Sequence, residues 1–553
     1  MSTVSPRDAV LRVEGLRVDA QSRNGPTQRI VDDVSFTLGA GEVLGLIGES
    51  GAGKSTIGLA ALGFARNGCT ISGGSLLFGD RDIRAMSLQE RRLLRGRGVA
   101  YIAQSAVAAF NPAMTIMRQV CEVPRRTAML SEIEAKAAAT ALFKELDLPE
   151  PETIGDRYPH QVSGGQLQRA LAAMAMIALP KIIVLDEPTT ALDVTTQVEV
   201  LAAFRKLIRT HGTAALYITH DLAVVAQIAD RIMVLRHGKM VELGSTEQVL
   251  HQPRQDYTRR LVAERQGGTR VTTAVLETQE PLLVLDGVTA SYARTLRVVE
   301  DISLQVRRGD TLAVVGESGS GKSTLARVIA GLLAREAGDV RFAGEPLAPS
   351  LKQRSRDQLR RIQMIYQSPD ASLNPRQTLH EIIGRPVRFY FDRPPAAVRA
   401  RVEELLHLID LPSSYIDRYP TELSGGQKQR VSIARALAAE PDLVICDEVT
   451  SALDQLVGDE ILQLLKRLQH ELGLAYMFIS HDLGTVRRVA NKVAVMLKGR
   501  IVAMGPVDEV FEPPLHEYTE LLLSSVPKMR TDWLDDVLTK RRGTPRRSAP
   551  MGV

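Results

Sequence analysis

The chain has 553 residues, 44% of them hydrophobic and 24% charged, which is the composition of an ordinary globular protein with room for more than one domain. Its longest apolar run, residues 170–179, is far shorter than the roughly 20 residues that span a bilayer. Cys69, Cys121 and Cys446 lie too far apart for a disulfide framework or a metal cluster. The net charge of +5 is concentrated in residues 528–553, with seven Lys/Arg against three Asp, so we expect no nucleic-acid binding.

The first half carries a glycine-rich loop, residues 48–56, between a strand-like run (43–47) and a helix-like run (57–62). Its glycines let backbone N–H groups surround phosphate oxygens at a helix N-terminus, and Lys54 is placed for the β- and γ-phosphates. The Ser55 hydroxyl is placed for Mg²⁺. The expected nucleotide contacts are Gly48, Ser50, Gly51, Gly53, Lys54, Ser55 and Thr56.

Further strand-like runs in this half end in polar residues. They are 98–103 before Gln104, 182–185 before Asp186 and Glu187, and 214–219 before His220. Strands alternating with helical patterns, such as 131–146, predict an α/β fold with a mostly parallel sheet and its chemistry at the carboxyl ends of the strands. Asp186 is placed to hold Mg²⁺ through water, and Glu187 to polarise the attacking water.

The chain is an internal duplication, because motifs in the second half follow their counterparts by 261 to 268 residues. We predict a first domain over residues 9–262, a polar linker over 263–281 and a second domain over 282–527. Residues 528–553 are expected to be a basic, disordered tail. The repeated site residues are Gly316, Ser318, Gly319, Gly321, Lys322, Ser323, Thr324, Gln367, Asp447, Glu448 and His481.

The most specific motifs are a pair of Ser-Gly-Gly-Gln stretches. They comprise Ser163, Gly164, Gly165 and Gln166, and Ser424, Gly425, Gly426 and Gln427. Alone, such a stretch would be read as a helix cap or a loop. Here each begins 23 residues before the Asp of its Asp-Glu pair, and with the phosphate loops the set resembles the ABC ATPases over nearly the whole chain.

The resemblance implies two tandem ABC-type P-loop ATPase domains, each with a mostly parallel sheet core and a helical subdomain. In that family the signature serine and glycine N–H groups contact the γ-phosphate held by the opposite domain, so two ATP molecules would be sandwiched head to tail. The glutamines match the loop that senses Mg²⁺, water and the permease, and the histidines match the switch near the γ-phosphate. Asp193 and Asp454 match the cross-dimer aspartate loop. The Mg²⁺ set is then Ser55, Gln104, Asp186, Ser323, Gln367 and Asp447, and the catalytic set Glu187, Glu448, His220 and His481.

Smaller motifs resemble the ATPase subunits of dipeptide/oligopeptide importers, including those for nickel or glutathione. They are Asn111-Pro112 and Asn374-Pro375 after the glutamines, and Tyr257-Thr258 and Tyr518-Thr519 near the end of each half. That system usually has two separate ATPases, whereas here they are fused. It implies two integral membrane permeases, an extracytoplasmic solute-binding protein and a peripheral position at the cytoplasmic face of the inner membrane. No cysteine follows Cys446, so no iron–sulfur cluster is expected.

We therefore predict the ATP-hydrolysing subunit of an importer for peptides, with glutathione, nickel and other small solutes left open. The alternative is a soluble double-ABC ATPase acting on ribosomes, although such proteins usually carry a longer, strongly charged linker. The family's adenine-stacking aromatic matches Tyr292 in the second half, whereas the equivalent region of the first half, near Ala20, has no aromatic residue before Phe36.

Overall fold

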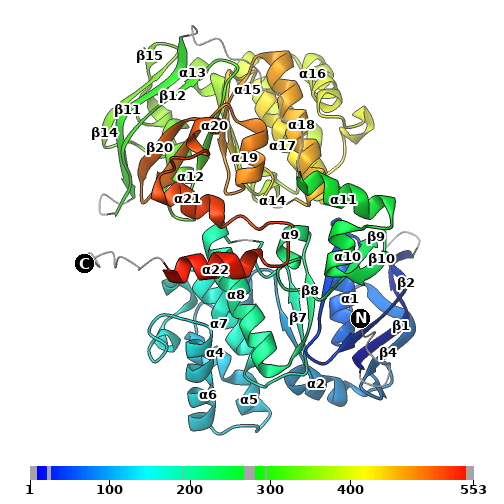
Figure 1. The fold of residues 1–553 in the computed structure, drawn as a ribbon. Coiled ribbons are helices and arrows are strands. Elements are labelled where there is room, and N and C mark those ends of the chain that lie inside the picture. The colour runs from blue at the N-terminus through cyan, green and yellow to red at the C-terminus, as the bar shows by residue number, and fades with distance from the viewer. Residues whose placement is uncertain are drawn as a thin grey trace. The chain divides into compact units, whose positions relative to one another are not determined.

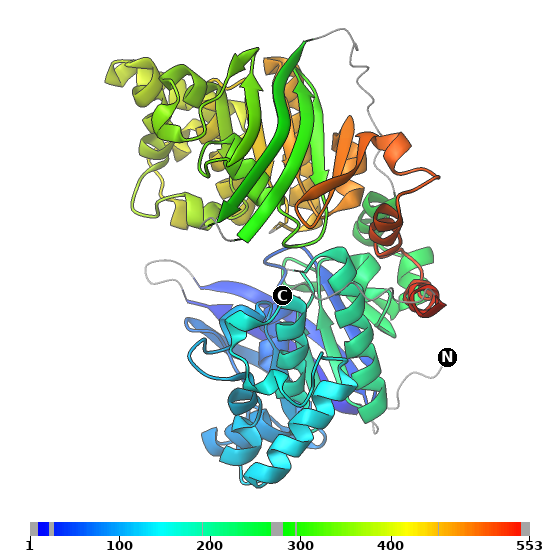
Figure 2. The same ribbon diagram turned by 90° about the vertical axis from the view of Figure 1, so that its left-hand side faces the viewer.

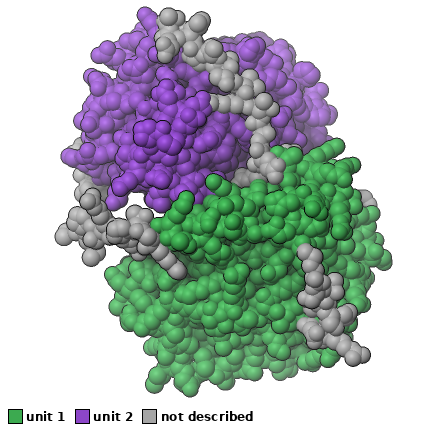
Figure 3. Space-filling model, in the orientation of Figure 1, with its two compact units in different colours: residues 1–268, 527–553 green, residues 269–526 purple. Residues whose placement is uncertain are grey.

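A computed structural model of the chain describes residues 9–21, 27–190, 192–266, 280–292, 296–451 and 453–543. It forms two compact units (Figures 1 and 3). The first unit contains residues 1–268 and 527–553, and the second contains residues 269–526. Most of the predicted linker, residues 267–279, lies outside the described residues.

The core of the first unit is a six-stranded sheet that is parallel except at one edge. Its order is β10 (Lys239–Ser245), β9 (Arg231–Arg236), β3 (Val43–Gly48), β8 (Ala214–Ile218), β7 (Ile182–Asp186) and β6 (Val99–Ile102). Only the β10–β9 pair is antiparallel among these described strands. Every residue of β3, β7 and β8 is buried, as expected of short apolar strands covered on both faces.

A second, antiparallel sheet packs beside it. Its order is β2 (Gln28–Gly39), β1 (Ala9–Ala20), β4 (Cys69–Phe78) and β5 (Arg81–Asp82). Alternate residues of β1, including Leu11 and Val13, join Leu44 of β3 and Ile57 of the first helix in one hydrophobic core. This contact fixes the phosphate-loop helix between the two sheets.

Helices cover the sheets and build a separate helical part between β6 and β7. The helices of the first unit are α1 (Lys54–Ala61), α2 (Leu88–Arg97), α3 (Ala106–Ala109), α4 (Ile116–Val120), α5 (Glu122–Arg126), α6 (Glu132–Glu145), α7 (Gly164–Met176), α8 (Val194–His211), α9 (Leu222–Val225), α10 (Thr246–His251), α11 (Asp256–Gln266) and α22 (Trp533–Gly543). The helix predicted over 131–146 is confirmed as α6, which begins with a capping box between Ser131 and Glu134.

The second unit repeats this architecture. One sheet is β12 (Leu296–Arg307), β11 (Pro281–Tyr292), β14 (Ala337–Phe342) and β15 (Glu345–Pro346), and its long strands β11 and β12 run side by side in Figure 2. The other is β16 (Ile362–Ile365), β17 (Leu443–Asp447), β18 (Ala475–Ile479), β13 (Thr311–Val315), β19 (Lys492–Leu497) and β20 (Arg500–Pro506). The predicted duplication of a mostly parallel core is therefore confirmed.

The helical subdomain is also repeated. The helices of the second unit are α12 (Lys322–Ile329), α13 (Arg356–Arg361), α14 (Pro369–Ser372), α15 (Leu379–Phe391), α16 (Pro395–Leu408), α17 (Gly425–Leu437), α18 (Gln455–Leu472), α19 (Leu483–Val489), α20 (Val507–Val510) and α21 (Glu517–Ser524). Ile383 of α15, Val402 of α16 and Val431 of α17 are fully buried against one another's helices. Within the described ranges, no helix is both long and apolar enough to cross a bilayer.

The expectation of a disordered C-terminal tail is wrong for residues 528–543. Trp533, Leu534 and Val537 give α22 one apolar face, and all three are buried in the first unit. The basic charges that suggested disorder lie mainly after this apolar group. Residues 544–553 are outside the described residues.

Candidate active sites

Each phosphate loop connects a buried strand to a helix, β3 to α1 and β13 to α12. The Lys54 ammonium is buried and donates to the carbonyl oxygens of Gly48 (2.6 Å) and Glu49 (2.8 Å). Gly53 begins α1 with φ of 93°, a conformation that suits glycine, and a Cβ there would lie 3.0 Å from the Ile30 carbonyl oxygen. The loop is thus wrapped around its own lysine, with the N-terminus of α1 facing the same space.

The second phosphate loop has the same form. Lys322 donates to Gly316 (2.8 Å) and Glu317 (2.7 Å), and Gly321 has φ of 104°. The predicted loop residues of each half are therefore brought together at the carboxyl edge of the sheet. We call the surroundings of Lys54 the first site and those of Lys322 the second site.

The strand next to the loop supplies a carboxylate in each site. Asp186, the last residue of β7, accepts a hydrogen bond from Ser55 Oγ at Oδ1 (2.9 Å) and from the Tyr101 hydroxyl at Oδ2 (2.7 Å). Burial and the bond to Asp186 raise the pKa of Tyr101, so the phenol stays protonated and donates. In the second site Ser323 Oγ donates to Asp447 Oδ1 (3.1 Å). Burial, with the Glu448 charge, raises the pKa of Asp447.

The candidate catalytic glutamate of the first site is held from three sides. Oε2 of Glu187 accepts hydrogen bonds from Gln104 Nε2 (3.1 Å) and Thr190 Oγ1 (3.2 Å). His220 Nδ1 lies 3.3 Å from Oε1 of the same carboxylate. Its φ of 49° is left-handed, which is costly for a residue with a Cβ and is typical of functional positions. Burial opposes ionisation of Glu187, but the hydrogen bond and charge of His220 outweigh it and lower the pKa of the carboxyl group.

The pKa of the neighbouring His220 is shifted upward, opposite to that of Glu187. Burial disfavours protonated His220, yet the hydrogen bond to Glu187 and its charge raise the pKa of the imidazole. In the second site Glu448 repeats the arrangement, with Gln367 Nε2 at 2.7 Å, His481 Nδ1 at 3.2 Å and φ of 50°. Glutamine, glutamate and histidine, predicted separately from the sequence, thus form one hydrogen-bonded group in each half.

The Ser-Gly-Gly-Gln stretches begin α7 and α17. Ser163 Oγ accepts from the Gln166 N–H (3.3 Å), and the Gln166 side chain accepts from the Ser163 N–H (3.0 Å); Ser424 and Gln427 match this. A Cβ on Gly165 would lie 2.2 Å from Thr196 Cγ2, so the close packing of α7 on α8 requires glycine. The helix-cap interpretation is therefore correct as local structure.

The same stretches also have exposed serines and first glycines. Among the described residues, no hydrogen bond joins either signature serine to the phosphate loop of its own unit. Their contact with ATP held by the other half remains a prediction. The two aspartates of the predicted aspartate loops are helix caps as well: Asp193 accepts from the Thr196 N–H (3.0 Å) and Asp454 from the Val457 N–H (3.1 Å).

Tyr292 lies at the end of β11 and is 36% exposed. Its hydroxyl accepts a hydrogen bond from Arg327 Nη1 of α12 (2.9 Å), so the ring is held beside the helix that follows the phosphate loop. Ala20 ends β1 in the first unit, and residues 22–26 after it lie outside the described residues. The contrast between Tyr292 and Ala20 for adenine binding stays a prediction.

Comparison with known proteins settles the family. Residues 31–190 and 299–451 match the ABC transporter family, and residues 502–552 match the oligopeptide/dipeptide transporter C-terminal region. The chain belongs to the ABC transporter family. The glutathione import ATP-binding protein GsiA of Salmonella choleraesuis (strain SC-B67) is 39% identical over 558 residues, which cover 94% of this chain and 89% of the relative. GsiA of Escherichia coli (strain K12) is 38% identical over 561 residues, with the same coverage.

Among solved structures, cbiO1 from Clostridium perfringens, part of the ABC transporter complex cbiONQ, is 29% identical with a TM-score of 0.39. The aligned region covers 42% of this chain and 90% of the cbiO1 chain. The family matches confirm the prediction of two tandem ABC domains and of an ATP-binding, ATP-hydrolysing protein. They give no support to the alternative of a ribosome-associated ATPase.

Sequence reasoning did not assign two tyrosines that this ABC ATPase places at its sites. Tyr518 was noted only as a subfamily marker, but its hydroxyl accepts a hydrogen bond from the Glu317 N–H (2.9 Å) and braces the second phosphate loop. Tyr101 was read only as part of a strand. In the structure it lies on β6, and its hydroxyl donates to Asp186 Oδ2 (2.7 Å), a contact between residues 85 apart that the strand pattern alone does not indicate.

Proposed function

We propose that this chain is the fused ATPase subunit of an importer for glutathione or short peptides. The observation that carries the proposal is the presence of two ABC transporter matches in one chain, joined to a C-terminal region that matches oligopeptide/dipeptide transporters. Relatives named as glutathione import ATP-binding proteins share this organisation over 89% of their length. One copy of the chain would therefore serve two permease subunits.

Each site would bind ATP together with Mg²⁺. Ser55 Oγ and Asp186 Oδ1 are oxygen donors 2.9 Å apart, and Ser323 Oγ and Asp447 Oδ1 are 3.1 Å apart, which suits a hard cation. Bound there, the ion would neutralise charge on the β- and γ-phosphates. Gln104 and Gln367, which donate to Glu187 and Glu448, would lie close to this ion.

The remaining chemistry belongs to the protein. Backbone N–H groups of the loop and Lys54 would hold the phosphates, and Glu187 would orient the attacking water. A carboxyl group with a lowered pKa is ionised at neutral pH and can accept a hydrogen bond from that water. His220 would keep the carboxylate in place through the 3.3 Å contact.

Coupling to the permeases would run through the glutamine loops. In the second unit a cavity of about 810 Å³ extends from Asp447 past Gln367 to Tyr390 and Arg435 of the helical subdomain. A permease segment seated there would touch Gln367, which donates directly to the catalytic candidate Glu448. The chain would thus lie at the cytoplasmic face of the membrane, with a solute-binding protein delivering solute from the other side.

The test is reconstitution of the chain in liposomes with candidate permeases and a solute-binding protein of the same importer family. ATP-driven uptake of labelled glutathione is expected, with dipeptides and Ni²⁺ as competing solutes that decide the specificity. A chain carrying Glu187→Gln and Glu448→Gln is the matched control and should show no uptake. Sedimentation with ribosomes and uptake of none of these solutes would contradict the proposal.

A further inference from the structure

The two sites differ in how the strand-end aspartate is held. Each carboxylate oxygen of Asp186 accepts a hydrogen bond: Ser55 Oγ donates to Oδ1 (2.9 Å), and the Tyr101 hydroxyl donates to Oδ2 (2.7 Å). Asp447 has Ser323 on Oδ1, and within the described part of the chain no side chain donates to its Oδ2.

A single substitution between the repeats accounts for the difference. Tyr101 of β6 pairs with Val184, two residues before Asp186, and Met364 of β16 pairs in the same register with Ile445, two residues before Asp447. Tyr101 and Met364 each precede the glutamine of their own half by three residues. Methionine offers a weakly accepting sulfur and no donor. The second site therefore has a side chain at this place that cannot hold the carboxylate.

A second hydrogen bond restricts a carboxylate in a way that one bond does not. With Ser55 alone, the Asp186 group could turn about its terminal torsion, which is a broad energy well. The Tyr101 bond fixes the plane of the carboxylate and leaves Oδ1 directed at Ser55. A ligand group that is already oriented loses less freedom when a cation binds, and partners of this kind usually change metal affinity by about 10- to 100-fold.

We propose that the Tyr101 hydroxyl is a positioning residue for the divalent cation of the first site, and that the second site, with Met364, binds the cation more weakly. The inference rests on the proposed role of Asp186 in holding Mg²⁺ with ATP. Tyr101 does not touch nucleotide in this role and acts through Asp186. Its ring packs against the hydrophobic core of the first unit, so removing the hydroxyl alone leaves the packing in place.

The experiment measures Mn²⁺ binding to the full chain in the presence of a non-hydrolysable ATP analogue, with free Mn²⁺ followed by electron paramagnetic resonance. A Lys322→Ala background reports the first site, and a Lys54→Ala background reports the second. Tyr101→Phe in the first background should weaken Mn²⁺ binding about tenfold, the lower end of the usual range because Asp186 acts through water. Met364→Tyr in the second background should tighten it severalfold.

Binding of the same nucleotide in EDTA is the control and should be unchanged by Tyr101→Phe. An equal loss of nucleotide affinity with and without metal would overturn the inference, as would unchanged Mn²⁺ affinity. Tyr101→Met, which installs the residue of the second half, repeats the test if the Phe variant does not fold. Absence of Mn²⁺ binding to the unsubstituted first site would instead contradict the proposed metal role of Asp186.

Discussion

At the scale of single residues, each candidate catalytic glutamate is held by side chains from neighbouring strand ends. Glu187 is contacted by Gln104 from the end of β6, by His220 from the end of β8 and by Thr190 from its own turn. Two segments distant in sequence, together with the turn that carries Glu187, therefore fix one carboxylate. A carboxylate so held serves positioning rather than ATP affinity, which comes from the phosphate loop.

Replacing both glutamates should accordingly stop turnover and spare binding. We expect Glu187→Gln with Glu448→Gln to slow ATP hydrolysis by about 10²- to 10⁴-fold, the usual contribution of a positioned base, while each amide retains the shape of the carboxylate. Steady-state ATPase rates and equilibrium binding of ATP measure the two effects. Hydrolysis at the unsubstituted rate would remove the glutamates from the catalytic role.

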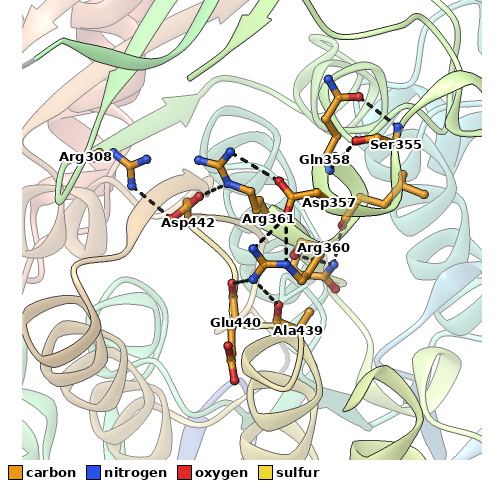
Figure 4. Close-up of polar contacts among 11 residues, drawn as sticks. Arg308, Ser355, Asp357, Gln358, Arg360, Arg361, Ala439, Glu440 and Asp442 are labelled. Atoms are coloured by element: carbon orange, nitrogen blue, oxygen red, sulfur yellow. Dashed lines mark hydrogen bonds and ion pairs between the residues drawn. The ribbon is translucent and has the colours of Figure 1, made fainter. Parts of the chain in front are cut away.

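At the scale of elements, the N-terminal ends of the second-unit strands carry an ion-pair network that has no counterpart among the described residues of the first unit. Asp442, before β17, accepts from Arg308 (3.1 Å) and from Arg361 at the end of α13, and Asp357 links Arg361 to Arg360 (Figure 4). In the first unit Lys181 and Gly98 stand at the places of Asp442 and Arg361. The network thus joins α13 and β17 in one half only.

This network predicts a pH dependence of the second unit. Burial of Asp442 raises its pKa, but hydrogen bonds from Arg361 and Arg308 outweigh burial, and the net pKa is lowered. A lowered pKa stabilises the folded state above the unfolded value of about 4 and stops doing so as pH falls through the folded value. We expect Asp442→Asn to destabilise the second unit by about 1–3 kcal/mol at pH 7, because two arginines lose their acceptor.

Hydrogen exchange of the β16 and β17 amides measures this change, with β6 and β7 of the first unit as the internal control. The difference between variant and unsubstituted chain should shrink below about pH 4. A difference that stays constant from pH 7 to pH 3 would show that the Asp442 charge is not the cause.

At the scale of the whole molecule, the end of the chain folds onto the first unit. Gln227, after α9, donates to the carbonyl oxygens of Lys528 (2.8 Å) and Arg530 (2.9 Å) and accepts from the Leu534 N–H (3.1 Å). Arg205 of α8 adds an ion pair with Asp535. Arg488, at the place of Gln227 in the second half, pairs with Asp459 instead.

Trp533 is the single tryptophan of the chain and reports this contact directly. We expect Gln227→Ala to remove the side-chain partner of the Leu534 N–H in α22 and of the Lys528 and Arg530 carbonyls before it. This should loosen the helix, giving a red-shifted Trp533 emission and faster quenching by acrylamide. Thr531→Ala, which removes one exposed hydrogen bond to Glu247, is the matched control and should change neither. Unchanged quenching in Gln227→Ala would mean that burial of Trp533 alone holds α22.

The sequence predicted well what depends on local spacing and on repetition. The phosphate loops, the strand-end carboxylates and the alternation of strands and helices are local patterns that occur twice in the chain. The fold is confirmed, and the structure places the loops and the carboxylates at the carboxyl edge of each parallel sheet. The α22 contact could not be predicted in this way, because Gln227 and Leu534 are 307 residues apart and no repeat of their contact exists in the described second unit. The contact of Tyr101 with Asp186 was missed for a related reason: the two residues are 85 apart, and the second half, with Met364 in the place of Tyr101, offers no repeat of it.

The last prediction concerns the sharing of each site between the halves. Ser163 and Ser424 are exposed at the first turns of α7 and α17, where a helix N-terminus favours an anion. In the part of the chain that the structure describes, neither serine bonds to the phosphate loop of its own unit. We expect Ser424→Arg to disable ATP hydrolysis at Lys54, and Ser163→Arg at Lys322, because the bulky side chain would occupy the place of the γ-phosphate. Trapping of a photoreactive ATP analogue, followed by mapping of the labelled half, measures each site separately. Loss confined to the half that carries the substitution would contradict the head-to-tail arrangement, whereas loss in the opposite half would establish that ATP is held by both.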